Sequence, residues 1–273
     1  MTLAVVGLGA MGSRIAARLL DAGYDVVVWN RTAEKAKPLV ERGASLAESP
    51  AYAAARAEAV IVMVTDPAAL ESVTADLAGV TVIQMSTVGR AAVARLASRL
   101  PELLDAPVLG SIAEAESGAL KIFVGGPEPL VEKWMPLLSV LGQPMHVGPV
   151  GAGSAAKLVA NATLVGLIGL LGESLALGEG LGFPRDVVFD VLATTALAQQ
   201  AERRRQAVES NDYPPRFALS LARKDAELIV DAAAEADVDI RLVAAARSWL
   251  AEAEAAGLGD LDYSAVLARI TGD

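Results

Sequence analysis

The sequence predicts a two-domain α/β protein, in which a doubly wound parallel sheet over residues 1–150 precedes an all-α domain over residues 151–273. Two observations predict this fold class. Apolar, β-branched runs alternate with helical patterns up to about residue 150, and only helical patterns follow. A long helix is expected to join the two domains. A chain of 273 residues is long enough to form both cores.

The first half shows the rhythm of strands and helices that a parallel sheet requires. The run AVIVMVT at 59–65 is continuously apolar, which is typical of a strand buried on both faces. Because ligands bind at the carboxyl ends of such strands, Val64, Thr65, Ser86 and Thr87 are candidate neighbours of a cofactor or substrate. The expected strands span 3–6, 25–30, 59–65, 80–89, 103–111, 121–126 and 144–148.

The motif GLGAMG at residues 7–12 lies between an expected strand and an expected helix. Gly7 allows a tight turn, Gly9 lets the backbone approach a pyrophosphate, and Gly12 lets the helix pack closely on the strand. The helix N-terminus then turns its free N–H groups toward the phosphates. The motif predicts a dinucleotide-binding Rossmann domain whose cofactor contacts include Gly7, Leu8, Gly9, Ala10, Met11 and Gly12.

The end of the second strand indicates which dinucleotide is bound. NAD sites usually carry Asp or Glu there to hold the ribose 2′-hydroxyl. This chain has Asn30, Arg31 and Thr32 instead. A guanidinium and a hydroxyl suit a 2′-phosphate, although an ordinary surface arginine remains the alternative. We therefore expect NADP as the cofactor, with NAD possible.

Helices are expected in the second half at 154–181, 186–209, 217–235, 239–256 and 262–270. Lys157 precedes an uncharged run at 158–172, and Asn161 lies four residues on, on the same helical face. A lysine desolvated against apolar walls has a pKa lowered toward the range of a general acid–base. Asn161 could orient a substrate oxygen. The alternative is a helix-end lysine over a packed seam.

Composition excludes several classes of protein. The net charge of −10 argues against nucleic acid as a partner. The chain has no cysteine and one histidine, His146, so we expect no metal site. The N-terminal apolar run lacks a basic segment before it, and the run at 158–172 is short and glycine-rich. We therefore expect a cytoplasmic protein with no membrane partner.

Other acid–base groups are scarce. No tyrosine is followed four residues later by lysine, which excludes the Tyr-x-x-x-Lys pair of short-chain dehydrogenases. His146 belongs to the last expected strand. Lys157 is therefore the first candidate for proton transfer beside a nicotinamide.

Together these motifs resemble those of the β-hydroxyacid dehydrogenases. The matching segments follow in order along nearly the whole chain: GLGAMG with NRT, MST at 85–87, DAPVLGS at 105–111, GAGSAAKLVAN at 151–161, the Phe…Lys-Asp segment at 217–225 and GDLDYSAV at 259–266. The resemblance implies an NADP(H)-dependent oxidoreductase that interconverts a small hydroxy acid and its aldehyde or keto form. It also implies a homodimer or homotetramer.

The resemblance further implies roles for single residues. Lys157 would be the catalytic acid–base, with Asn161 beside it. The substrate and nicotinamide would meet Thr87, Gly110, Ser111, Phe217, Lys224 and Asp225; Lys224 would lie near the nicotinamide or the substrate carboxylate, and Phe217 would wall the pocket.

The chain departs from the family pattern at two positions. The substrate-carboxylate loop commonly begins with serine, whereas this chain has Leu109, so anchoring would shift to Ser111 and backbone N–H groups. Ala160 replaces the histidine of the phosphogluconate dehydrogenase branch, which argues against that sugar acid. The Gly-Ser pair and NRT favour the glyoxylate and semialdehyde reductases.

Two alternatives stay open. Imine reductases share the domain plan but usually have Asp or Tyr at the position of Lys157. Leu109 keeps this alternative open, because imine substrates lack the carboxylate that the loop would hold. A non-catalytic NADP-binding module is the other, although such a module would not need Lys157, Asn161, Lys224 and Asp225.

Overall fold

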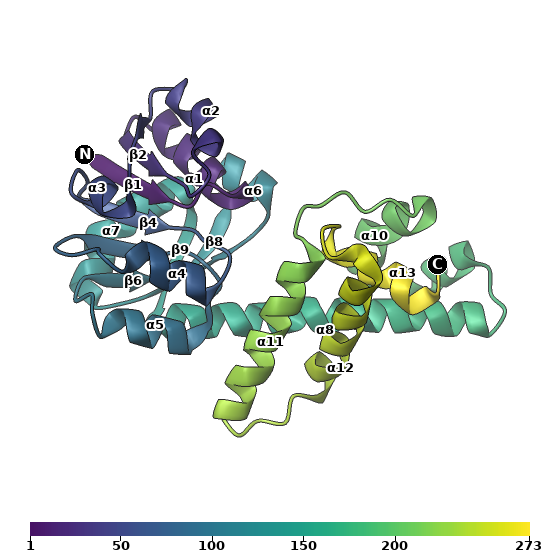
Figure 1. The fold of residues 1–273 in the computed structure, drawn as a ribbon. Helices are drawn as coiled ribbons and strands as arrows, with labels where there is room; N and C mark the ends of the chain where they lie inside the picture. The colour runs from purple at the N-terminus through teal and green to yellow at the C-terminus, as the bar shows by residue number, and fades with distance from the viewer. The chain divides into compact units, whose positions relative to one another are not determined.

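The computed structural model describes residues 1–273, which divide into two compact units, Met1–Lys157 and Leu158–Asp273. The first unit is a sheet with helices on both faces, and the second is entirely helical (Figure 1). The division lies inside one helix, α8 (Ala152–Gly180), which continues from the first unit into the second. The predicted fold class, including the long connecting helix, is confirmed.

The sheet of the first unit has the strand order β3-β2-β1-β4-β5-β6-β8-β7, with β9 paired to β8. The strands from β3 to β6 are parallel, whereas β8 is antiparallel to both β6 and β7. Because the strand order reverses at β1, the switch point between β1 and β4 is where ligands bind in such sheets. The strands are β1 Thr2–Val6, β2 Asp25–Trp29, β3 Ser45–Leu46, β4 Ala59–Val62, β5 Thr81–Gln84, β6 Leu103–Asp105, β7 Val108–Leu109, β8 Leu120–Gly125 and β9 Gly142–Gly148.

Both faces of the sheet are buried, as the continuous apolar strands predict. Leu3 and Val5 of β1 belong to a core that includes Ile15 of α1, whereas Ala4 and Val6 belong to a core on the other face. This alternation follows from the two-residue period of a strand. The helices of this unit are α1 Ala10–Asp21, η1 Ala33–Ala36, α2 Lys37–Val40, α3 Pro50–Ala54, α4 Pro67–Thr74, α5 Gly89–Ala97, α6 Ile112–Ser117 and α7 Glu128–Leu141.

Two details of the sheet differ from expectation. The expected strand at 103–111 is split into β6 and β7 around Pro107, whose missing N–H interrupts the ladder. Strand β3 was not expected, because two residues at a sheet edge are too few to show a periodic pattern.

The second unit packs its helices around one core that includes Leu171, Leu175, Phe189 and Leu250. Helices α11 and α12 lie side by side (Figure 1). Besides α8, the elements are α9 Arg185–Leu192, α10 Ala198–Ser210, α11 Leu219–Glu235, α12 Arg241–Ala253, a π-helical turn η2 Glu254–Leu258, η3 Tyr263–Ala265 and α13 Val266–Thr271.

The single helix expected at 186–209 is wrong, since the structure has α9 and α10 there. The hydroxyls of Thr194 and Thr195 donate to the carbonyl oxygens of Val191 and Leu192, each at 2.7 Å. Threonine side chains that bond to nearby backbone compete with helical hydrogen bonds. Two in succession end α9.

By length and hydropathy alone, α8 could cross a bilayer, with a mean hydropathy of 1.7 over its most apolar window. Half of that window is buried within the protein. Core helices of soluble proteins meet the same criteria, so this property is weak evidence for a membrane segment.

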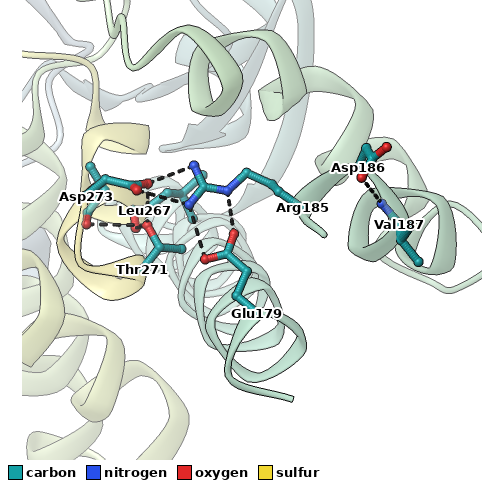
Figure 2. A network of polar contacts seen from close by, with 8 residues as sticks. Glu179, Arg185, Asp186, Val187, Leu267, Thr271 and Asp273 are labelled. Atoms are coloured by element: carbon teal, nitrogen blue, oxygen red, sulfur yellow. Dashed lines mark hydrogen bonds and ion pairs between the residues drawn. The ribbon is translucent and has the colours of Figure 1, made fainter. Parts of the chain in front are cut away.

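Arg185 holds three segments of the second unit together (Figure 2). Its guanidinium donates to both carboxylate oxygens of Glu179, at the end of α8, and lies 2.9 Å from Asp273 Oδ2. The hydrogen bond from Arg185 is the main cause that lowers the pKa of the Asp273 carboxyl. Thr271 also donates to Asp273, at 2.8 Å. The contact joins α8, α9 and the segment after α13.

We expect Arg185→Gln to lower the free energy of unfolding at pH 7 by about 1 kcal/mol, because two carboxylates lose their cation. The pKa of Asp273 is lowered by folding from 3.8, so its contribution is present above pH 3.8 and is lost as the pH falls through the lower folded value. The free energies of unfolding of wild type and variant, measured by urea denaturation, should therefore converge at acid pH.

The matched control is Arg241→Gln, which removes a guanidinium that is 88% exposed and forms an ion pair with Asp239. It should change stability by less than about 0.5 kcal/mol. A difference between wild type and Arg185→Gln that stays constant from pH 7 to pH 3 would contradict the assignment.

Candidate active site

The glycine turn after β1 combines two glycines that the fold requires with one that leaves space open. Gly7 has a φ of +96°, and a Cβ there would lie 2.1 Å from the carbonyl oxygen of Met63. A Cβ on Gly12 would lie 1.9 Å from the carbonyl oxygen of Gly7. A Cβ on Gly9 would meet nothing within 4 Å. The turn is thus tightly packed at Gly7 and Gly12, whereas the space next to Gly9 is open.

Asn30 fixes this turn to the end of β2. Its Oδ1 accepts a hydrogen bond from the Leu8 N–H at 2.9 Å, and its Nδ2 donates to the Thr32 carbonyl at 2.9 Å. Both polar atoms of the amide are therefore used within the protein. The neighbouring side chains of Arg31 and Thr32 are exposed.

The carboxyl ends of β4 and β5 are braced by Ser86, which is buried. Its hydroxyl accepts from the Val64 N–H at 2.8 Å. Thr65 donates to Asp66 at 2.8 Å, and Thr87 lies half-buried after β5. Ser86 was a candidate ligand contact, but the structure gives its hydroxyl a structural partner.

The turn Gly110–Ser111 follows β7 and lies on the same edge of the sheet. Because β7 and β6 are both antiparallel to β8, β7 runs in the direction of β6. The chain therefore leaves β7 at the edge where β1, β4 and β5 also end. Ser111 precedes α6 and contacts Glu114: its N–H donates to Glu114 Oε2 at 2.7 Å, and its hydroxyl donates to the same oxygen at 2.5 Å.

The first turn of α8 is anchored on Asp105, the last residue of β6. Asp105 is fully buried, and it accepts from the Ser154 N–H and the Ser154 hydroxyl at 2.7 Å each. Burial raises the pKa of the Asp105 carboxyl, and the hydrogen bonds from Ser154 oppose that rise. A Cβ on Gly153 would lie 2.1 Å from the Asp105 carbonyl oxygen, so only glycine allows this approach.

This anchor positions Lys157, which lies one helical turn beyond Ser154. Lys157 is buried, with 8% of its surface exposed. Asp105 and Ser154 were not predicted from the sequence as positioning residues. The available signal was the serine in the first turn of an expected helix, together with an aspartate at the end of an expected strand.

In the second unit, Asn161, Lys224 and Asp225 are in contact. Asn161 Nδ2 donates to Asp225 Oδ2 at 2.7 Å, and Lys224 Nζ lies 2.9 Å from Asp225 Oδ1. Asn161 and Asp225 are both buried. Because a carboxylate only accepts, the amide must turn its NH2 group to Asp225 and keep Oδ1 as an acceptor.

Phe217 is held by the GDLDYSAV segment. Asp262 accepts from the backbone N–H groups of Arg216 and Phe217 at 3.2 Å each, and Ser264 donates its hydroxyl to Asp262 at 2.6 Å. The rings of Phe217 and Tyr263 have centroids 5.7 Å apart. Asp262 is thus a further positioning residue that was not predicted from the sequence.

His146 has backbone partners. Its Nε2 lies 3.1 Å from the Gly126 carbonyl oxygen and 3.0 Å from that of Gly148. The acid–base role of Lys157 stays a prediction from the sequence.

Both units match models of known protein families. Residues 2–153 match the NAD-binding domain of 6-phosphogluconate dehydrogenase, and residues 151–270 match the NAD-binding domain of NADP-dependent 3-hydroxyisobutyrate dehydrogenase. Glyoxylate/succinic semialdehyde reductase 1 of Arabidopsis thaliana is 34% identical over 99% of this chain and 98% of its own. The chain belongs to the β-hydroxyacid dehydrogenase family. Like its relatives in this family, it is an NAD(P)-dependent oxidoreductase acting on CH–OH groups.

Solved structures agree with the family assignment. The 3-hydroxyisobutyrate dehydrogenase of Mycobacterium tuberculosis, solved with L-serine, has a TM-score of 0.88 at 27% identity, over 98% of each chain. An imine reductase from a Pseudomonas species has a TM-score of 0.64 at 26% identity, over 97% of each chain. The fold is therefore shared by both enzyme classes considered from the sequence.

The first unit of this β-hydroxyacid dehydrogenase fits the dinucleotide that the family binds. No side chain caps the N-terminus of α1, and the space above Gly9 is open. A groove of about 660 Å³ begins at Leu8, Gly9 and Ala10 but continues along α1 toward Asp21 and Arg42, and its lining includes no residue of β4, so it is not the space at the β1–β4 switch point. Uncapped N–H groups at a helix N-terminus suit a phosphate.

Proposed function

We propose that this enzyme interconverts a small hydroxy acid and its aldehyde or keto form, with NADP(H) as cofactor and Lys157 as the acid–base. One observation carries the proposal. A single buried lysine is anchored, through Ser154 and Asp105, at the carboxyl edge of the nucleotide-binding sheet. The family's relatives are reductases and dehydrogenases of such substrates.

Lys157 would donate a proton to the carbonyl oxygen during reduction and would take it back during oxidation. The bound nicotinamide supplies or accepts the hydride. Asn161 keeps Oδ1 as an acceptor, because Asp225 holds its NH2 group at 2.7 Å. Oδ1 would therefore accept from the hydroxyl of the hydroxy-acid form; the carbonyl oxygen of the aldehyde or keto form has no proton to donate to it. A buried partner that fixes one end of an amide pre-organises the other end.

The remaining contacts are proposed residue by residue. Gly7, Leu8, Gly9, Ala10, Met11, Gly12, Asn30, Arg31, Thr32, Val64, Thr65, Thr87 and Lys224 would hold the cofactor, and Thr87, Gly110, Ser111, Phe217, Lys224 and Asp225 would contact the substrate. NADP is proposed over NAD because Arg31 and Thr32 are exposed and no carboxylate follows β2 directly.

We also propose a cytoplasmic homodimer or homotetramer assembled through the helical unit. Large apolar side chains are exposed there, including Leu177 at 64%, Leu181 at 68% and Val191 at 57%. Exposed apolar surface of this kind is typical of protein interfaces. Light scattering of the purified protein measures the assembly directly.

The test is a substrate panel of glyoxylate, succinic semialdehyde and cyclic imines, assayed with NADPH and with NADH. We expect carbonyl reduction with NADPH preferred by at least tenfold. Arg31→Ala should lower kcat/KM for NADPH by about tenfold or more and leave that for NADH nearly unchanged, because a charge-assisted hydrogen bond to the 2′-phosphate is lost.

Other outcomes identify the alternatives. Activity on cyclic imines alone would favour the imine reductase class, whose solved structures share this fold. Tight NADPH binding without oxidation by any substrate would favour a non-catalytic module. A preference for NADH would contradict the proposed role of Arg31.

A further inference from the structure

The turn proposed to receive the substrate's acid group already contacts a carboxylate of the protein. Both polar hydrogens of Ser111, the N–H and the hydroxyl, point to Glu114 Oε2, at 2.7 Å and 2.5 Å. The stem of the same side chain lies over the turn, since a Cβ on Gly110 would be 3.0 Å from Glu114 Cβ. Glu114 therefore occupies the donors that an acid substrate would use.

We propose that Glu114 is a specificity residue that competes with the substrate's carboxylate for Ser111. This inference rests on the proposed function, because it concerns the same substrate turn. An ionised substrate acid must displace Glu114 from both donors and then lie beside its negative charge. A substrate whose group at this turn is uncharged meets neither obstacle.

The local sequence strengthens this competition. Leu109, the residue before the turn, has no hydroxyl to offer as a replacement donor. Glu114 is only partly buried, so its carboxylate lies within reach of a ligand. The capping geometry fixes the carboxylate in place: Ser111 precedes α6, and Glu114 reaches back to its N–H. The contact that caps α6 thus also weakens the binding of an acid group at this turn.

Glu114 is expected to affect charged and uncharged substrates differently. Glu114 weakens the binding of aldehydes and ketones that present a carboxylate to Gly110 and Ser111, and it leaves unaffected those that present an ester, a hydroxyl or another uncharged group there. The effect lies on substrate binding rather than on the chemical step, so it should raise KM for acids without lowering kcat.

The experiment compares succinic semialdehyde with its methyl ester, which differ only in the charge of the acid group. Glu114→Gln removes the charge but keeps an oxygen that accepts from the Ser111 N–H, so α6 stays capped. We expect KM for the acid to fall by at least about tenfold in the variant, with kcat within about twofold and KM for the ester unchanged.

The matched control is Glu116→Gln, on the same helix, whose carboxylate is 58% exposed and pairs with Arg14 at 3.2 Å. It should leave both KM values unchanged, and thermal melting should show that both variants fold. An acid KM in Glu114→Gln that is unchanged or higher would overturn the inference while leaving the proposed function in place. Absence of activity in the wild type on this pair and on the whole carbonyl panel would overturn both.

Discussion

Lys157→Ala is expected to lower kcat by about a thousandfold or more, while the affinity for NADPH changes by no more than about twofold. Removing the group that transfers the proton in the transition state typically costs 10²–10⁴ in rate. The cofactor contacts proposed for the glycine turn and for Arg31 do not involve this lysine. Stopped-flow turnover and fluorescence titration of NADPH measure the two quantities separately.

Two further variants make this result specific. Lys157→Arg keeps the positive charge but does not release a proton near neutral pH, so it should be as inactive as alanine. Lys121→Ala, at an exposed lysine whose hydrogen bond is to Gln143, should keep full turnover. Wild-type turnover in Lys157→Ala would exclude this residue as the acid–base.

Gly153→Ala is expected to destabilise the protein strongly, because its Cβ would lie 2.1 Å from the Asp105 carbonyl oxygen and 2.4 Å from that of Phe123. Both are backbone atoms of the sheet and have little freedom to move. We expect a loss of about 2–4 kcal/mol in the free energy of unfolding. The shift of α8 should also reduce kcat, since Lys157 lies one turn further along the helix.

Gly180→Ala is the matched control on the same helix, since its Cβ would meet nothing within 4 Å. It should be neutral or stabilising by less than about 1 kcal/mol, because alanine favours helix over glycine. Urea denaturation compares the two variants. Equal stabilities would show that α8 does not require the close approach at Gly153.

The sequence predicted best those features whose evidence is local. The glycine turn is identified by spacing within residues 7–12, and the structure accounts for Gly7 and Gly12 by the carbonyl oxygens that a Cβ would meet. The change from strands to helices near residue 150 is likewise visible in short windows of sequence. Local patterns failed at 186–209, where threonine hydroxyls that bond to the backbone end a helix.

The candidate site was predicted only in part. Lys157 and Asn161 could be paired because they are four residues apart on one helix. The role of Asp105 could not be predicted, because it meets Ser154 across 49 positions of sequence. The hydrogen bond from Asn161 to Asp225 likewise joins residues 64 positions apart. The contact between Glu114 and Ser111 is different, because Ser-x-x-Glu is the local pattern of a capping box; this contact could have been read from the sequence and was missed.

By itself the sequence determined the class of fold, the dinucleotide motif and the lysine most suited to move a proton, since each depends on residue type at short spacing. Only the tertiary structure decided which groups hold that lysine's helix in place and which end of the Asn161 amide stays available. These are matters of hydrogen bonding between elements, and a buried polar group must find a partner wherever the fold brings one within about 3 Å. That distance is set by the packing of strands and helices, which no local pattern of residues contains.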